Sequence, residues 1–252
     1  MTDRHLAEQV AWLKGELFWK LDPHQEEIYD VLNSMDWEEA LFFCSRRFGK
    51  SYLSIIMALE FCLKNPGSIV RVAAESYKQI QDIVEDNMSP IIAGAPEGLI
   101  VREKSSYRYK VGSSSLRLGC TAAAHVDTLR GGNAHFVILE EGGSVPSDDY
   151  KKAIRSILGP QLLLTEGSIL HVTTPSEEED HFIHTEVLPE CEQAGTCFIR
   201  DVYANTKLSA KQIEKQIRRS GGEHTEEWKR EFLCQVIRPK ELTILPEFHS
   251  DM

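Results

Sequence analysis

Residues 44–51 read Cys-Ser-Arg-Arg-Phe-Gly-Lys-Ser and could bind the phosphates of a nucleotide. A phosphate-binding loop has the pattern G-x-x-x-x-G-K-[ST] between a strand and a helix. Gly49, Lys50 and Ser51 match this pattern, whereas Cys44 stands in place of the first glycine. In such a loop backbone N–H groups hold the phosphates, the lysine neutralises the β and γ oxygens, and the serine hydroxyl binds Mg²⁺. A helix that begins with Gly-Lys-Ser by chance is the alternative for this stretch alone.

Two adjacent carboxylates, Glu140 and Glu141, end the apolar run at residues 135–141. In ATPases that carry this kind of phosphate-binding loop, the first acid commonly contacts Mg²⁺ through water, and the second polarises the attacking water. Both acids would lie at the C-terminal end of a central strand, where ligands bind in parallel sheets. Glu140 replaces the usual aspartate and reaches one methylene further. An ordinary strand end that emerges into solvent is the alternative.

Two weaker signals accompany the loop and the acidic pair. Thr173, Thr174 and Pro175 follow another strand-like run, and their hydroxyls could sense a γ-phosphate. Gln25 precedes the loop, and a glutamine amide can pair with both the donor and the acceptor on the edge of adenine. A strand followed by a proline turn, and a solvated glutamine, explain the same residues without a function.

The elements that must position these side chains alternate between strand and helix. We expect strands at residues 39–45, 68–74, 135–141, 167–175 and 196–204, and an antiparallel hairpin at 99–119. We expect helices at 6–19, 21–35, 50–65, 76–92 and 147–159, the last closed by Gly159, and two more around Gly221-Gly222. This order predicts an α/β fold of the P-loop NTPase type, RecA-like, with a mostly parallel sheet flanked by helices. Residues 1–204 would form the ATPase domain and 205–252 a small helical subdomain.

The composition sets limits on function. The 252 residues carry a net charge of −11, which argues against coating nucleic acid through bulk charge but leaves room for a local basic strip. The six cysteines include no CxxC pair, so we expect reduced intracellular thiols without a zinc site or disulfides. No apolar run reaches the ~18 residues that span a bilayer.

The motifs above, taken together, resemble the ATPase domain of the large terminase subunit of tailed bacteriophages, the motor that packages DNA into a procapsid. The resemblance rests on Gln25, the loop at 44–51, the pair Glu140-Glu141, and Thr173-Thr174-Pro175. It extends from about residue 15 to the end. In that family the loop typically lacks its first glycine and carries an arginine, a place that Arg46 takes here.

The resemblance implies ATP and Mg²⁺ as cofactors, and it implies a role for each matched residue. Glu141, Arg46 and Arg130 would be catalytic, and Ser51 and Glu140 would bind the metal. Contacts to the nucleotide would come from Gln25, Cys44, Ser45, Arg46, Arg47, Phe48, Gly49, Lys50, Ser51 and Thr174. Arg130 occupies the position of an arginine finger that reaches the γ-phosphate of a neighbouring subunit. A loop arginine in a surface salt bridge is the alternative for Arg130.

The implied partners are double-stranded DNA, the portal protein and procapsid, the small terminase subunit, and further copies of the chain in a ring. No membrane partner is expected, and the implied place of action is the host cytoplasm. The nuclease half that normally follows is expected to be absent, either removed or encoded in another gene. A nucleotide-dependent DNA-binding or assembly module with little turnover remains an alternative, as does a helicase-like ATPase, although a helicase would need a second RecA-like lobe.

Three further groups of residues each have two interpretations. One helix face carries basic residues that could contact DNA phosphates or could simply be solvated. They are Lys207, Lys211, Lys215 and Arg218 or Arg219. The same choice applies to a smaller cluster made of Lys151, Lys152 and Arg155. His181 and His184 have a spacing that could bind a metal, but no third ligand accompanies them.

Overall fold

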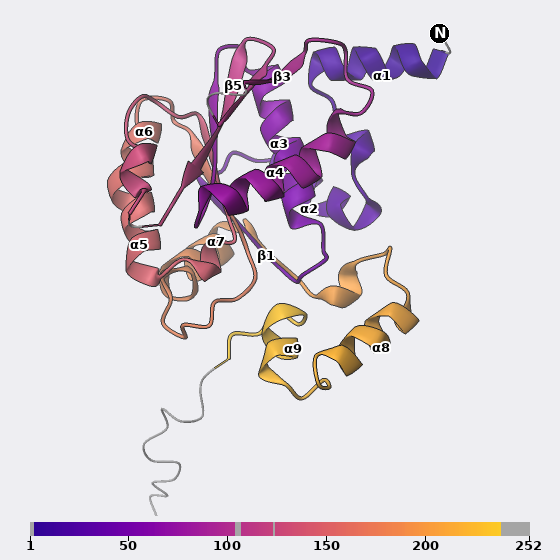
Figure 1. The fold of residues 1–252 in the computed structure, drawn as a ribbon, viewed down its shortest axis with the longest axis vertical. Coiled ribbons are helices and arrows are strands. Elements are labelled where there is room, and N and C mark those ends of the chain that lie inside the picture. The colour runs from indigo at the N-terminus through magenta and orange to yellow at the C-terminus, as the bar shows by residue number, and fades with distance from the viewer. Residues whose placement is uncertain (1–2, 104–106, 123, 238–252) are drawn as a thin grey trace, which may run out of the picture.

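The computed structural model describes residues 3–103, 107–122 and 124–237, and its centre is an eight-stranded sheet (Figure 1). The strand order across the sheet is β3-β4-β5-β2-β6-β7-β1-β8. The strands are β1 (Glu39–Cys44), β2 (Ile69–Ala74), β3 (Ile100–Glu103), β4 (Arg108–Val111), β5 (Ser114–Cys120), β6 (Phe136–Glu140), β7 (Ser168–Thr173) and β8 (Cys197–Arg200). The neighbours from β5 to β8 pair in parallel, whereas β3 and β4 extend the sheet as an antiparallel edge.

Helices cover both faces of this sheet (Figure 1). One face packs against α1 (Asp3–Lys14), α2 (Pro23–Asn33), α3 (Lys50–Lys64) and α4 (Tyr77–Ile92). The other face packs against α5 (Ser147–Lys152), α6 (Gly159–Leu162) and α7 (Leu188–Ala194). The result is a three-layered α/β domain that matches the predicted RecA-like P-loop fold.

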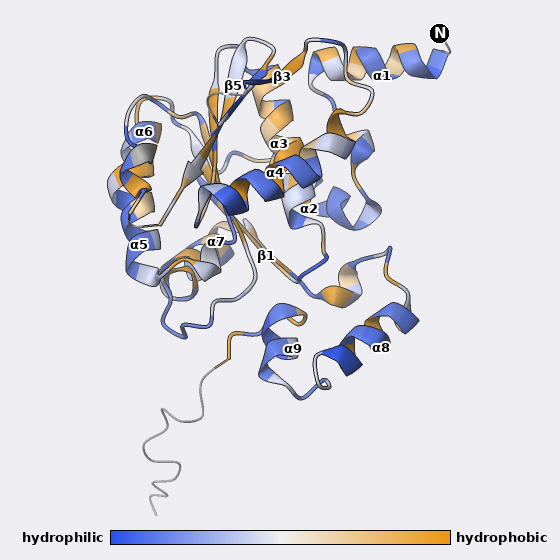
Figure 2. Cartoon of the chain, viewed as in Figure 1, coloured by the Kyte–Doolittle hydropathy of each residue, from blue (hydrophilic) through white to orange (hydrophobic). Residues whose placement is uncertain are grey.

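The central strands are buried on both faces, so they appear in the sequence as continuous apolar runs. Residues 40–44 of β1 are all buried, and so are all five residues of β6. Helix α3 is also apolar over most of its surface, because it lies against the sheet beneath α2 and α4 (Figure 2). These buried runs are the reason that the strands could be placed from sequence.

The hairpin expected at 99–119 is present, but two helix predictions need correction. The helix beginning at Ser147 does not close at Gly159. It continues through a π-helical segment (Ala153–Leu158) into α6, because Gly159 keeps right-handed helical dihedral angles. The first helix ends at Lys14 rather than near residue 19, since Gly15 has a φ of 68°.

Two short helices after the sheet, α8 (Ala210–Arg219) and α9 (Glu226–Glu231), form a separate small cluster (Figure 1). Its core is made of Val202, Ile213, Trp228 and Phe232. A capping box of Ser209 with Gln212 begins α8. Because this core includes Val202, the boundary at 204/205 stays a prediction, and residues 238–252 lie outside the described part of the chain. No helix among the described residues is long and apolar enough to cross a membrane.

Candidate active site

The predicted phosphate loop connects the C-terminal end of β1 to the first turn of α3. Gly49 has a φ of 90°, and a Cβ on it would lie 2.6 Å from Nε2 of Gln25. That Nε2 donates a hydrogen bond of 2.9 Å to the carbonyl of Gly49, while Oε1 accepts one from the backbone of Asp22. Glycine is therefore required here. Gln25 secures the loop to α2 in this structure, and its role with adenine stays a prediction.

Lys50 and Glu141 meet at the same edge of the sheet, as the sequence predicts. Nζ of Lys50 lies 3.2 Å from Oε1 of Glu141. The lysine is buried, whereas the carboxylate is partly exposed. Glu141 has a left-handed backbone with a φ of 51°, a conformation that is uncommon for a residue other than glycine. The turn after β6 therefore holds Glu141 in a special conformation beside the loop lysine.

Glu140 is buried at the end of β6 and accepts two hydrogen bonds from the N-terminal part of α3. Ser51 Oγ donates to it at 2.8 Å and Ser54 Oγ at 2.5 Å. Burial raises the pKa of Glu140 to about 7, although the two hydroxyls act in the opposite direction. Ser54 was not among the residues predicted from the sequence. Its position three residues after Ser51, on the same face of a helix, was the available signal.

The oxygen atoms around Glu140 suit Mg²⁺. Mg²⁺ prefers hard oxygen ligands and usually keeps several waters while it takes one or two carboxylates and the phosphates of a substrate. The Ser51 hydroxyl and the Glu140 carboxylate, 2.8 Å apart, supply such ligands. The described residues contain no group of three or more His, Cys, Asp or Glu side chains able to hold a metal. Waters and the phosphates of a nucleotide would have to supply the remaining ligands.

The two threonines lie at the same sheet edge, after β7. Thr173 Oγ1 accepts a hydrogen bond of 2.8 Å from the backbone of Gly143, so β7 holds the turn that carries Glu141. Thr173 also donates to the carbonyl of Thr174 at 2.7 Å. Both threonines are buried. A contact of Thr174 with a nucleotide stays a prediction.

The other loop residues face in different directions. Arg46 Nε lies 2.5 Å from Oε2 of Glu231 in α9, which raises the pKa of Arg46. Arg47 has a φ of 68° and, with Arg46, lines a cavity of about 290 Å³ between the loop and the C-terminal helices. The thiol of buried Cys44 donates to the carbonyl of Phe198 in β8.

The remaining two loop residues are also buried. The ring of Phe48 packs edge-on against His24, with 5.0 Å between the ring centroids. The hydroxyl of Ser45 has no hydrogen-bond partner in the described part of the chain. Cys44, Ser45 and Phe48 therefore offer only backbone groups to a phosphate in this conformation.

Arg130 is exposed and forms its ion pair with a residue close by in the sequence. Its Nε lies 2.7 Å from Oδ1 of Asp127 three residues earlier. The hydrogen bond and charge of Arg130 lower the pKa of Asp127. The next residue, Gly131, accepts a hydrogen bond of 2.6 Å from Arg71 in β2. Among the described residues, Arg130 makes no contact with Lys50 or Glu141, so its catalytic role stays a proposal.

Two other places do not provide a nucleotide or metal site. His181 Nε2 is 2.8 Å from the carbonyl of Val145, and His184 accepts from the backbone of Ser176. The two rings also pack edge-on, 6.0 Å between centroids, while their nitrogens are used by the backbone.

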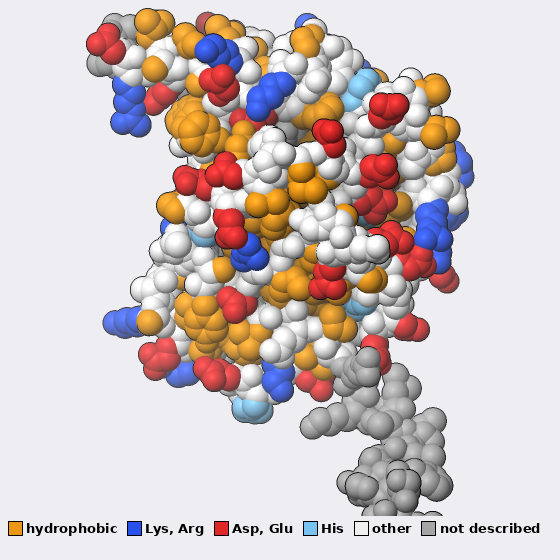
Figure 3. Space-filling view, turned by 180° about the vertical axis from the view of Figure 1, so that it is seen from behind, with side chains coloured by type: hydrophobic (Ala, Val, Ile, Leu, Met, Phe, Trp, Pro, Cys, Tyr) orange, Lys and Arg blue, Asp and Glu red, His pale blue; other side chains and the backbone are white. Residues whose placement is uncertain are grey.

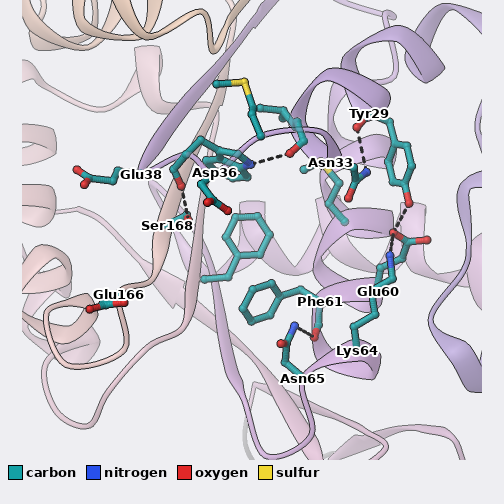
Figure 4. Close-up of a pocket in the computed structure, with 15 residues that line it drawn as sticks. Tyr29, Asn33, Asp36, Glu38, Glu60, Phe61, Lys64, Asn65, Glu166 and Ser168 are labelled. Atoms are coloured by element: carbon teal, nitrogen blue, oxygen red, sulfur yellow. Dashed lines mark hydrogen bonds and ion pairs between the residues drawn. The ribbon is translucent and has the colours of Figure 1, made fainter.

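A cavity of about 720 Å³ lies at the opposite end of the sheet from the loop, near the start of β1 and the end of α3 (Figure 4). Trp37, Phe61 and Phe136 contribute to its lining. Asp36, Glu38 and Glu166 lie around it and would repel phosphates. Its charge and position exclude it as the nucleotide site.

The fold and the site define a P-loop nucleotide-binding domain of the RecA-like type. The chain belongs to the family "Terminase large subunit, T4likevirus-type, N-terminal", whose model matches residues 41–251. The predicted family is thereby confirmed. A search of curated proteins found no match.

Solved structures of phage terminases share this fold. The large terminase ATPase domain of Thermus phage P74-26 is 18% identical, with a TM-score of 0.66, over 94% of this chain and 98% of that one. The HK97 bacteriophage large terminase is 17% identical, with a TM-score of 0.66, over 85% and 50%. The large terminase from a thermophilic bacteriophage, solved in complex with ADP, is 13% identical, with a TM-score of 0.64, over 91% and 53%. The chain thus spans about half the length of these last two proteins.

The buried Glu140 predicts how stability changes with pH. Its pKa is about 7 in the native state against 4.5 ordinarily, so the native state binds the proton more tightly than the unfolded state. The free energy of unfolding should therefore fall as pH rises from about 4.5 to about 7. Glu140→Gln stays uncharged, so it should gain up to about 3 kcal/mol relative to the wild type between pH 4 and pH 8.

Urea unfolding in EDTA at several pH values measures this difference. The exposed Glu97→Gln is the matched control and should stay parallel to the wild type. If the difference in unfolding free energy between the wild type and Glu140→Gln stays constant across this range, the pKa of Glu140 is not raised in the native state.

Proposed function

We propose that this chain is the ATPase motor domain of a viral DNA-packaging terminase and hydrolyses ATP to move double-stranded DNA into a procapsid. The observation that carries the proposal is the pairing of Lys50 with Glu141 beside a buried Glu140 that is bound by two α3 serines. Family membership supports it, and the large terminase of the thermophilic bacteriophage has been solved with ADP and with ATP-gamma-S. Packaging as an activity of the whole protein, with portal and small-subunit partners, is part of the same proposal.

Each residue at the site has a task in this proposal. The loop N–H groups and the N-terminus of α3 would bind the phosphates, and Lys50 would neutralise their charge. A γ-phosphate beside Lys50 would compete with Glu141 for its ammonium group, and the released carboxylate could then polarise the attacking water. Bound Mg²⁺, held through Ser51 and Glu140, would neutralise charge on the phosphates. Because the buried Lys50 ammonium group needs a negative partner, phosphates that bind to it would release Glu141 to act as the base.

Hydrolysis is not the only outcome that this geometry allows. Glu141 is bound by Lys50 at 3.2 Å, so in this conformation it is not free to activate water. A module that binds nucleotide and seldom turns over would show the same ion pair. The two functions differ in whether nucleotide binding releases Glu141, and ATP turnover by the assembled motor separates them.

A row of arginines on the antiparallel side of the sheet supports contact with DNA. Arg71 of β2 lies in register with Arg117 of β5, which lies in register with Arg108 of β4. Adjacent strands are about 4.8 Å apart, so like charges follow one another closely. Burial and then the next arginine in the row lower the pKa of both Arg71 and Arg117. Arg71 is buried, so Arg117 and Arg108 are the two members of the row that would meet the phosphates of a nucleic acid.

One acidic side chain partly offsets the row. Glu103 lies 3.8 Å from Arg108, and its negative charge also acts on Arg117. On the face shown in Figure 3, acidic and basic side chains are interspersed. With a net charge of −11, the chain needs a local basic site of this kind to hold DNA. The basic face of α8 is the competing site.

The nucleotide site predicts the effects of two substitutions. Lys50→Ala should abolish ATP turnover and weaken nucleotide binding, because the phosphates lose their main charge partner. Glu141→Gln keeps the shape but not the charge, so it should bind ATP and fail to hydrolyse it. Steady-state ATPase with procapsid, portal and DNA, together with nucleotide binding by the isolated chain, measures both effects. Normal hydrolysis by either variant would remove that residue from the mechanism, and no hydrolysis by the assembled wild type would favour the binding module.

The arginine row predicts how DNA binding depends on salt. Arg117→Ala should weaken binding to DNA of any sequence and reduce the slope of log affinity against log salt by about 1. Arg4→Ala, which removes an exposed arginine of α1, should leave the slope unchanged. If Lys211→Ala reduces the slope and Arg117→Ala does not, α8 is the DNA-binding surface instead.

The exposed Arg130 predicts activity supplied between subunits. Arg130→Ala should leave ATP binding by the isolated chain nearly intact, yet remove most of the hydrolysis in the assembled motor, because such fingers contribute roughly 10³–10⁵ in rate. Mixing Arg130→Ala with Glu141→Gln subunits should restore partial activity, since some interfaces then pair an intact arginine with an intact glutamate. If every mixture stays inactive, Arg130 does not act in the neighbouring site.

A further inference from the structure

The turn that carries Glu141 rests on a buried tyrosine. A Cβ on Gly142 would lie 2.5 Å from the hydroxyl oxygen of Tyr150 and 2.6 Å from its Cζ. The tyrosine side chain thus fills the space that any other residue at position 142 would need. Since Glu141 and Gly142 are adjacent, the tyrosine limits where the backbone of the Glu141 turn can lie.

Tyr150 in turn belongs to a chain of buried polar groups. Its hydroxyl oxygen is 2.7 Å from Nδ1 of His171 in β7, and Nε2 of His171 is 3.3 Å from Oε2 of Glu39 in β1. Tyr150 and His171 are fully buried, whereas the Glu39 side chain is 35% exposed. The hydrogen bond from His171 lowers the pKa of Glu39, which is therefore a carboxylate at neutral pH. This fixes the direction of the chain, with His171 donating to Glu39 and Tyr150 donating to His171.

The chain and the turn are held by the same strand. His171 and Thr173 are two residues apart in β7, so they lie on the same face of the sheet. Thr173 binds the backbone of Gly143 directly, and His171 reaches Gly142 through Tyr150. Two side chains of β7 therefore fix two successive residues after Glu141.

Burying this chain of polar groups among apolar side chains costs free energy. Tyr150 belongs to an apolar cluster with Leu41, Phe43 and Val145. Buried polar groups in such surroundings need every hydrogen bond satisfied, and an apolar replacement of the same shape is often neutral or stabilising. Packing alone therefore does not explain a tyrosine, a histidine and a glutamate in this order, whereas fixing the direction of a turn does.

We propose that Tyr150 and His171 are positioning residues that fix the Gly142-Gly143 turn, and with it the place from which Glu141 acts in hydrolysis, with Glu39 orienting the histidine. The proposal rests on the proposed ATPase function. It adds three residues that neither touch the nucleotide nor belong to the phosphate loop. Their effect is on the catalytic step rather than on nucleotide binding.

The test is Tyr150→Phe, which keeps the ring under Gly142 and removes only the hydroxyl. In the full chain assembled with procapsid, portal and DNA, kcat should fall about 10- to 100-fold, because a small misplacement of a catalytic group has effects of this size. KM should stay within about twofold. His171→Gln, whose amide can accept from Tyr150 and donate to Glu39, should retain more activity than His171→Leu.

Tyr29→Phe is the matched control. Its hydroxyl is also buried, donates at 2.6 Å to Glu60, and lies in α2 on the other face of the sheet. Removing it should reduce stability similarly without changing kcat.

Hydrogen exchange of the isolated chain provides a readout that needs no activity. The amides of Gly142 and Gly143 should exchange faster in Tyr150→Phe than in the wild type, and Tyr29→Phe should leave them unchanged. Unchanged exchange, or a wild-type kcat in Tyr150→Phe when the wild type hydrolyses ATP, overturns the positioning role. If the wild type itself does not hydrolyse ATP in the assembled motor, the proposed function fails, and the exchange result still decides whether Tyr150 holds the turn.

Discussion

The site depends on a carboxylate that cannot reach bulk water. Glu140 ends a central strand at 1% exposure, and desolvation of a charge costs several kcal/mol unless hydrogen bonds offset it. Ser51 and Ser54 offset part of this cost from the N-terminal part of α3, while burial still raises the pKa of Glu140 to about 7. A divalent cation would complete the compensation. The requirement to satisfy Glu140 therefore fixes the start of α3 against β6, and with it the loop that precedes α3.

Much of this arrangement follows from the sequence, because its causes are local. Continuous apolar runs mark strands that are buried on both faces, and parallel strands bring their carboxyl ends to one edge. Lys50 and Glu141 were therefore predictable neighbours. The partners of Glu140 and Arg46 were harder to predict, because no motif includes Ser54 or Glu231. Their contacts depend on how α3 and α9 pack against neighbouring elements, which residue types alone do not specify.

Two glycines, Gly15 and Gly159, show that residue type alone does not decide where a helix ends. Gly15 ends its helix with a φ of 68°, and a Cβ there would lie 3.0 Å from Leu63. Gly159 has the same residue type after a helical pattern, yet it keeps a φ of −53° and the helix continues. Glycine permits a left-handed end to a helix without imposing one. The outcome at each site depends on whether tertiary packing favours the turn, and the sequence pattern around Gly159 carried no sign of that packing.

The phosphate loop is also joined to α9 by an ion pair of Arg46. The backbone N–H of Arg46 donates to the carbonyl of Glu231, and the Arg46 side chain binds the Glu231 carboxylate. A guanidinium has five N–H donors in a planar fork, and only Nε is used by Glu231. The terminal nitrogens could bind a phosphate without breaking this ion pair. A phosphate bound in the loop would then attract the same Arg46 guanidinium that holds α9. Phosphate binding and the position of α9 therefore depend on one side chain.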